Sequence, residues 1–279
     1  MAGLDAVDPS FAAWLIAGLL ATGLAAGVLA GLLGVGGGIV IVPVLYSVLS
    51  ALGVDETVRT HVAVATSLAT IIPTSIASAR AHARKGAVDW SLARALGPWN
   101  FIGAAFGAVV AVSIDGQNLG RVFGIAALIV AFDLARHRPA EAIADPEMKT
   151  LGAPIAAPLG TAIGFVSALM GIGGGTLAVP ALRYLGVGMH RAVATSATLG
   201  LVIAAPSAIG FIVGGQNVAD LPPFSIGYVN AAGFVIIATA TFMTASIGSR
   251  LAHALSARAL RLVFAAFLTV TAARMLIAG

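Results

Sequence analysis

The sequence predicts an all-α integral membrane protein of about ten transmembrane segments. We expect two inverted five-segment repeats, with helices broken at two Gly-x-Gly-Gly-Gly motifs. The 279-residue chain is 59% hydrophobic and 9% charged, with a mean hydropathy of +1.02, whereas soluble domains carry about 25% charged residues. Its apolar runs are continuous rather than alternating, which argues against a transmembrane β-barrel.

Ten apolar segments follow one another along the chain. They lie at 11–33, 39–52, 62–79, 95–113, 119–135, 153–171, 175–187, 192–213, 225–247 and 260–278. Most are long enough to cross a hydrocarbon core of about 30 Å, which takes roughly 20 residues. The second and seventh are too short, because a helix of about 14 residues spans only about 21 Å. Both follow a glycine run, so we expect half-helices that begin inside the membrane.

The distribution of basic residues predicts the orientation. The first ten residues hold two aspartates and no Lys or Arg, so the first segment is expected to be a retained helix rather than a signal peptide. If this acidic terminus lies outside and every segment crosses, all Lys and Arg except Arg59, Arg121 and Arg274 fall inside. That distribution satisfies the positive-inside rule. Basic residues spread over short loops also argue against a nucleic-acid partner, despite the net charge of +4.

Three short patterns recur in the two halves of the chain. They are the glycine runs 34–38 and 171–175, each followed by a proline, the stretches 61–67 and 190–196, and the Asn-ending tripeptides 98–100 and 228–230. Five crossings per half is an odd number, so the second half must run upside down relative to the first, with its site at the midplane. We expect a first repeat at 1–136, a cytoplasmic linker at 137–152 and a second repeat at 153–279.

The glycine runs are the strongest candidates for a substrate site. The first N–H groups of a helix lack intrahelical partners, and the helix dipole places positive charge at that end. Glycine lets an anion approach the bare backbone, and Pro43 and Pro180 fall in first turns, where a missing N–H costs little. The alternative is close helix packing through small residues.

Other polar residues of the apolar segments also have two interpretations. The hydroxyls of the Ala-Thr-Ser motifs are suited to donate to an anion or to a carbonyl one turn earlier, and the two asparagines to bind substrate or to bridge helices. His61 and His190 fit helix caps, anion attraction or proton coupling. Asp133 fits ion pairing near Arg136 or proton coupling.

Several classes of chemistry have no support in the sequence. The chain has no cysteine, which excludes disulfides and thiolate chemistry. No zinc-protease, serine-hydrolase or nucleotide-binding motif occurs. We therefore predict no catalytic residue, no metal site and no cofactor.

The paired glycine motifs, the Ala-Thr-Ser motifs and the stretch from Arg84 to Trp90 resemble the TauE/SafE family of sulfite exporters, from about Gly27 to Met275. The resemblance implies a bacterial inner-membrane carrier, without a cofactor, for sulfite, sulfonates or related anions. The second half departs from the first in having Gly214-Gly215-Gln216 where the first has a basic run. The substrate-binding residues predicted from repeat and resemblance together are Gly36, Gly37, Gly38, Thr66, Ser67, Asn100, Gly173, Gly174, Gly175, Thr195, Ser196 and Asn230.

The leading interpretation is a secondary transporter that exports a small sulfur-containing anion by alternating access, with a periplasmic N-terminus. Its expected partners are the anion and the lipid bilayer, and a homodimer is compatible with it. The alternatives are a transporter of another anion or metabolite, and an intramembrane enzyme or structural membrane protein.

Overall fold

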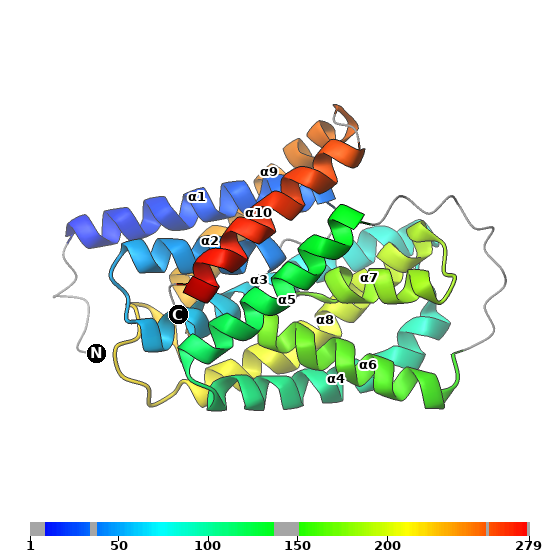
Figure 1. Cartoon of the computed structure of the whole chain (residues 1–279), viewed down its shortest axis with the longest axis horizontal. Coiled ribbons are helices and arrows are strands. Elements are labelled where there is room, and N and C mark those ends of the chain that lie inside the picture. The colour runs from blue at the N-terminus through cyan, green and yellow to red at the C-terminus, as the bar shows by residue number, and fades with distance from the viewer. Residues whose placement is uncertain (1–8, 34–37, 137–150, 255–256, 278–279) are drawn as a thin grey trace.

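The computed structural model describes residues 9–33, 38–136, 151–254 and 257–277. It confirms an all-α protein rich in apolar helices (Figure 1). Four of the described helices, α3, α4, α6 and α8, are long and apolar enough to cross a membrane. The elements are α1 (Pro9–Leu33), α2 (Gly38–Ala51), α3 (Glu56–Arg84), α4 (Trp90–Ser113), α5 (Gly116–Arg136), α6 (Ala153–Met170), α7 (Gly174–Tyr184), α8 (Met189–Gly214), β1 (Ser225–Ile226), β2 (Val229–Asn230), α9 (Ala231–Ala254) and α10 (Ala257–Ile277).

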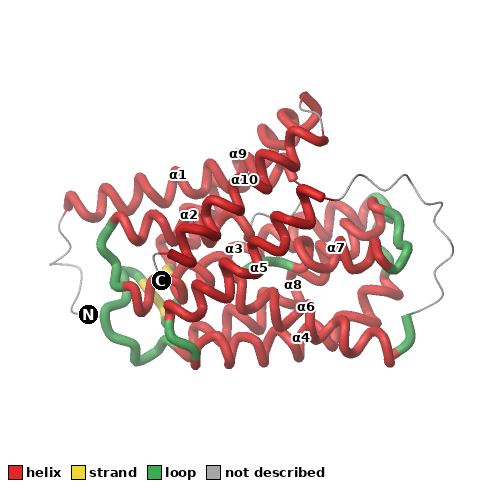
Figure 2. Tube along the Cα trace, viewed as in Figure 1, coloured by secondary structure: helices red, strands yellow, loops and turns green. Residues whose placement is uncertain are grey.

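Most connections between the described helices lie at two ends of the bundle, whereas the connection between α6 and α7 lies in its interior (Figure 2). At the basic end, named for Arg84, Lys85, Arg183 and Arg191, α3 and α7 end and α4, α6 and α8 begin. At the hairpin end, the strands β1 and β2 join α8 to α9.

The start of α6 and the end of α7 lie at the same end of the bundle. Pro154 and Pro158 at the start of α6 line one surface groove with Ala181 and Tyr184 at the end of α7. The chain therefore enters at the basic end in α6, reverses at residues 171–173 and returns to the same end in α7.

A left-handed glycine produces this reversal. Gly171 ends α6 with φ = +64°, a conformation that side chains other than glycine rarely adopt. The N–H groups of Gly171 and Ile172 then donate to the carbonyls of Ala168 and Ser167, which satisfies two of the carbonyls left free at a helix end. The second glycine motif thus begins with a helix C-cap.

The two halves of the chain are interleaved. α1 runs along α9, where Thr241 Oγ1 donates to the carbonyl of Gly23. In the same way, α6 runs along α4, and a Cβ added at Gly103 would lie 2.2 Å from Thr161 O. In both pairs the first helix of one half contacts the fourth helix of the other.

Two further helix pairs between the two halves pack in antiparallel directions. In α3 and α8, Ser75 contacts Gly200, while Thr195, earlier in α8, lies by Asp89, beyond the end of α3. In α5 and α10, the start of α5 packs near the end of α10, where Gly124 faces Leu276.

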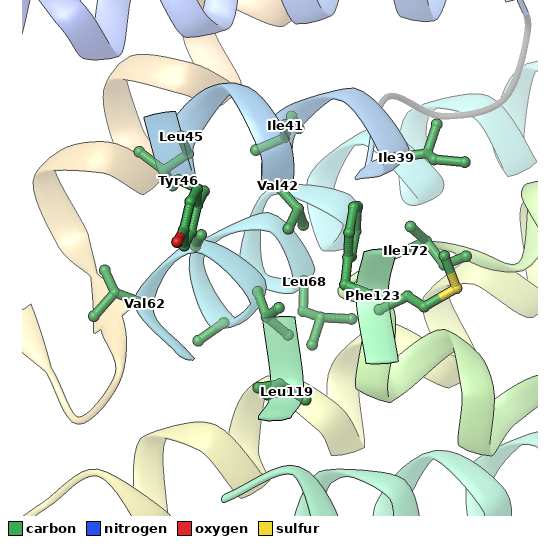
Figure 3. Packing of buried hydrophobic residues seen from close by; sticks show 14 of the residues in the cluster. Ile39, Ile41, Val42, Leu45, Tyr46, Val62, Leu68, Leu119, Phe123 and Ile172 are labelled. Atoms are coloured by element: carbon green, nitrogen blue, oxygen red, sulfur yellow. The ribbon is translucent and has the colours of Figure 1, made fainter. Parts of the chain in front are cut away.

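The largest core cluster lies around α2, α3 and α5. Ile41, Leu45 and Leu68 are among its buried members, and Phe123 is fully buried beside them (Figure 3). Ile172, from the reversal between α6 and α7, belongs to the same cluster. The reversal is therefore anchored in the core of the first half.

Candidate functional site

The described parts of the two glycine runs meet in the interior. A Cβ added at Gly38 would lie 3.1 Å from the carbonyl oxygen of Gly171. The hydroxyl of Ser67 joins the two runs, because Oγ lies 2.7 Å from Gly171 O and 3.3 Å from Gly38 O. Ser67 is fully buried. Gly36 and Gly37 lie outside the described residues.

The start of α7 is a helix N-terminus inside the protein. Gly173 is its N-cap and makes no side-chain capping bond. Gly174 packs closely on α8, where an added Cβ would lie 3.0 Å from Gly200 N and 3.1 Å from Ser196 O. Among the described residues no acceptor is found for the N–H of Gly174 or Gly175. Close packing at Gly174 is therefore present at α7, together with N–H groups that have no acceptor among the described residues.

The threonines of the two Ala-Thr-Ser motifs make the same contact in each half. Thr66 Oγ1 accepts the N–H of Asn230 at 3.0 Å, and Thr195 Oγ1 accepts the N–H of Asp89 at 3.0 Å. Asn230 directly precedes α9 and Asp89 is the N-cap of α4. Each threonine therefore holds the start of the fourth helix of the opposite half, and neither makes the expected bond one turn back.

The comparison of Asn100 with Asn230 is wrong in the structure. Asn100 lies well inside α4, where its Nδ2 donates to Leu96 O. Asn230 caps α9: its Oδ1 accepts the N–H of Gly233 and its Nδ2 donates to Pro223 O. The counterpart of Asn230 is Asp89, whose Oδ1 accepts two N–H groups at the start of α4.

Asp89 also forms an ion pair with Arg191 at the basic end. Partial burial alone raises the pKa of the Asp89 carboxyl, but the hydrogen bonds from the start of α4 and the Arg191 guanidinium outweigh it and lower the pKa overall. The pair joins α4 of the first half to α8 of the second. Sequence reasoning missed Asp89 as a site residue, although it lies in the stretch from Arg84 to Trp90 that carried the family resemblance.

Four described side chains near this region hold buried polar atoms without a hydrogen-bond partner. They are Asn100 through Oδ1, Ser167, Thr176 and Ser196 through their hydroxyls. All four lie on α4, α6, α7 or α8. Buried polar atoms are normally paired, so this part of the interior carries unused hydrogen-bonding capacity. Ser167 and Thr176 were not predicted; the position of Thr176 directly after the glycine run was the available signal.

The histidines and Asp133 lie away from the glycine runs. His61 Nε2 is 3.1 Å from the carbonyls of Ala111 and Ile114 at the end of α4, and its ring stacks on Tyr228. These contacts correspond to the helix-capping interpretation of His61 rather than to anion attraction or proton coupling. His190 is exposed at the start of α8, and Asp133 is half-buried near the end of α5.

Comparisons with known proteins agree on a membrane transporter. The model of the family described as sulfite exporter TauE/SafE matches residues 19–275. A probable membrane transporter protein of Haemophilus influenzae is 31% identical over 242 residues, which cover 87% of this chain and 90% of the relative. Another, from Methanocaldococcus jannaschii, is 29% identical over 88% of this chain and 89% of its own length. No solved structure matches. The chain is a multi-pass membrane protein that belongs to the TauE/SafE family of membrane transporters.

Proposed function

We propose that the chain is a secondary transporter that exports a small sulfur-containing anion, sulfite or an organosulfonate, across the bacterial inner membrane. The observation that carries this proposal is the meeting of the two glycine runs in the interior, joined by Ser67. A helix N-terminus with free N–H groups suits an oxyanion, and the family description names sulfite.

The mechanism that we propose is alternating access by two inverted halves of five segments, with α2 and α7 as half-crossing helices. Antiparallel packing of α3 on α8 and of α5 on α10 supports an axis in the membrane plane, as does the exchange of α1 and α6 between halves. The repeated contacts of Thr66 and Thr195 support it further. Under this proposal the hairpin end, where α1 begins (Figure 1), is periplasmic, because the basic end is cytoplasmic.

The proposed site combines backbone and side-chain donors. Gly38, with Gly36 and Gly37 of the same run, and the run 173–175 supply backbone N–H groups, while Ser196 and Asn100 supply polar side chains. Ser67 holds the two glycine runs together through its hydroxyl. Thr66, Thr195 and Asn230 keep the adjoining helix starts in place. Recognition by neutral donors avoids a fixed counter-charge, which favours release of the anion after transport.

Transport by proteoliposomes tests this function. Vesicles containing the purified protein are preloaded with sulfite or sulfoacetate, and release of the anion is compared with that from protein-free vesicles. Thermal stability in detergent is measured in parallel against sulfite, sulfoacetate, taurine, thiosulfate, sulfate, phosphate and acetate. Binding to the folded state stabilises it by about 2.7 kcal/mol at a hundredfold excess over Kd. Efflux and stabilisation by a sulfur anion are expected; if no anion of the panel does either, the proposed substrate class is wrong.

A further inference from the structure

The serines of the two Ala-Thr-Ser motifs have different environments. Ser67 and Ser196 are both fully buried and occupy equivalent positions in the repeat. The hydroxyl of Ser67 donates to the glycine runs. Within the described part of the chain, the hydroxyl of Ser196 has no hydrogen-bond partner. A buried hydroxyl without a hydrogen-bond partner lowers the stability of the folded state. The unpaired hydroxyl of Ser196 therefore indicates a position where a ligand accepts its hydrogen bond.

Ser196 faces the start of α7. Its carbonyl oxygen would lie 3.1 Å from a Cβ at Gly174. Its repeat equivalent, Ser67, directs its hydroxyl to within 3.3 Å of Gly38 O at the start of α2, and α2 is the repeat equivalent of α7. Under the proposed repeat, the Ser196 hydroxyl takes the corresponding direction toward the first turn of α7.

Thr176 adds a second unused hydroxyl in this first turn. It is 8% exposed, and its Oγ1 has no partner among the residues that the structure describes. The N–H groups of Gly174 and Gly175 precede it, likewise without an acceptor there. The first turn of α7, at the positive end of its dipole, thus holds one unpaired hydroxyl and two N–H groups, and the α8 residue that packs against it holds a second unpaired hydroxyl. The basic side chains of these two helices, Arg183 and Arg191, lie at the other end of α7 or at the start of α8.

We infer that Ser196, Thr176 and the N-terminus of α7 together bind one oxyanion group of the substrate. This inference rests on the proposed transport of a sulfur-containing anion. The matching chemistry is a compact group with several oxygens, such as sulfite or the sulfonate of an organosulfonate, because separate oxygens accept from the hydroxyls and from the N–H groups. Ser67 is structural, since its hydroxyl already holds the two glycine runs together.

Matched substitutions at the two serines test the inference. Kd for sulfite and for sulfoacetate is measured on the full-length protein in detergent, from the dependence of Tm on anion concentration. Ser196→Ala and Thr176→Val should each raise Kd ten- to hundredfold, the effect of losing one hydrogen bond to a charged group. Ser196→Thr, which keeps a hydroxyl, should retain most of the affinity.

Ser67→Ala is the control, because it removes the equivalent hydroxyl where that hydroxyl is already paired. It should lower Tm without anion and change Kd less than threefold, whereas Ser196→Ala should leave Tm without anion unchanged or higher. If Ser196→Ala does not fold, Thr176→Val carries the test. Wild-type affinity in the Ser196 and Thr176 variants, or an equal loss in Ser67→Ala, would overturn the inference while leaving the transport function intact. Absence of any anion effect on the wild type would refute both.

Discussion

Close contact between α4 and α6 gives a sharp prediction about the interleaving of the two halves. A Cβ at Gly103 would lie 2.2 Å from Thr161 O and 2.8 Å from Thr161 Cα, both of which are backbone atoms. No side-chain rotation relieves such a clash, so Gly103→Ala must move the two helices apart by about 1 Å. Gaps of this size remove a quarter to a half of the dispersion energy of each contact. Overpacking typically costs about 1–3 kcal/mol, and a backbone clash belongs at the upper end. We expect a net loss of about 2–3 kcal/mol.

The control is Gly120→Ala in α5. Gly120 is also a buried helical glycine, but an added Cβ would meet Thr60 Oγ1 at 3.5 Å, an ordinary contact. Alanine is the better helix former by about 1 kcal/mol, so this variant should be as stable as wild type or slightly more so. Both variants are compared by reversible SDS unfolding in mixed micelles, followed by circular dichroism. Equal stability of the two variants would refute the close packing of α4 on α6.

Two more predictions concern the contacts between halves. Thr66→Val leaves the buried N–H of Asn230 without its acceptor and should lower the free energy of unfolding by about 1–3 kcal/mol. Thr195→Val should lower it by a similar amount, because it removes the acceptor for the N–H of Asp89. SDS unfolding measures both variants, and wild-type stability in both would contradict the role of the threonines in holding the helix starts. For Asp89, the lowered folded-state pKa means that its stabilising contribution is complete above the ordinary value near 3.9 and disappears as pH falls through the folded-state pKa. The stability difference between wild type and Asp89→Asn should therefore be about 1 kcal/mol at pH 7 and shrink below about pH 4, as measured by unfolding across pH; a difference independent of pH would exclude the ion pair as its source.

Much of the fold could be predicted from the sequence because a lipid environment constrains local composition strongly. Long apolar runs with few charges have no other stable arrangement than helices that satisfy their own backbone, so helix positions followed from the chain alone. The two short segments behind glycine runs predicted interior helix starts, and α2 and α7 begin where expected. The repeated Ala-Thr-Ser motifs correctly drew attention to Thr66 and Thr195, which make equivalent contacts in the two halves.

Only the tertiary structure decided how these elements meet. The bond from Ser67 to Gly171 joins residues 104 positions apart, and nothing local indicates which of two equivalent serines makes such a bond and which is left unpaired. The sequence pattern matched Asn230 with Asn100, whereas the structure matches it with Asp89, because a capping role depends on where a helix begins in space and not on residue type. The return of α7 to the basic end was likewise not evident from the sequence, because the short apolar segment predicted where α7 begins but not that the chain turns back toward the start of α6.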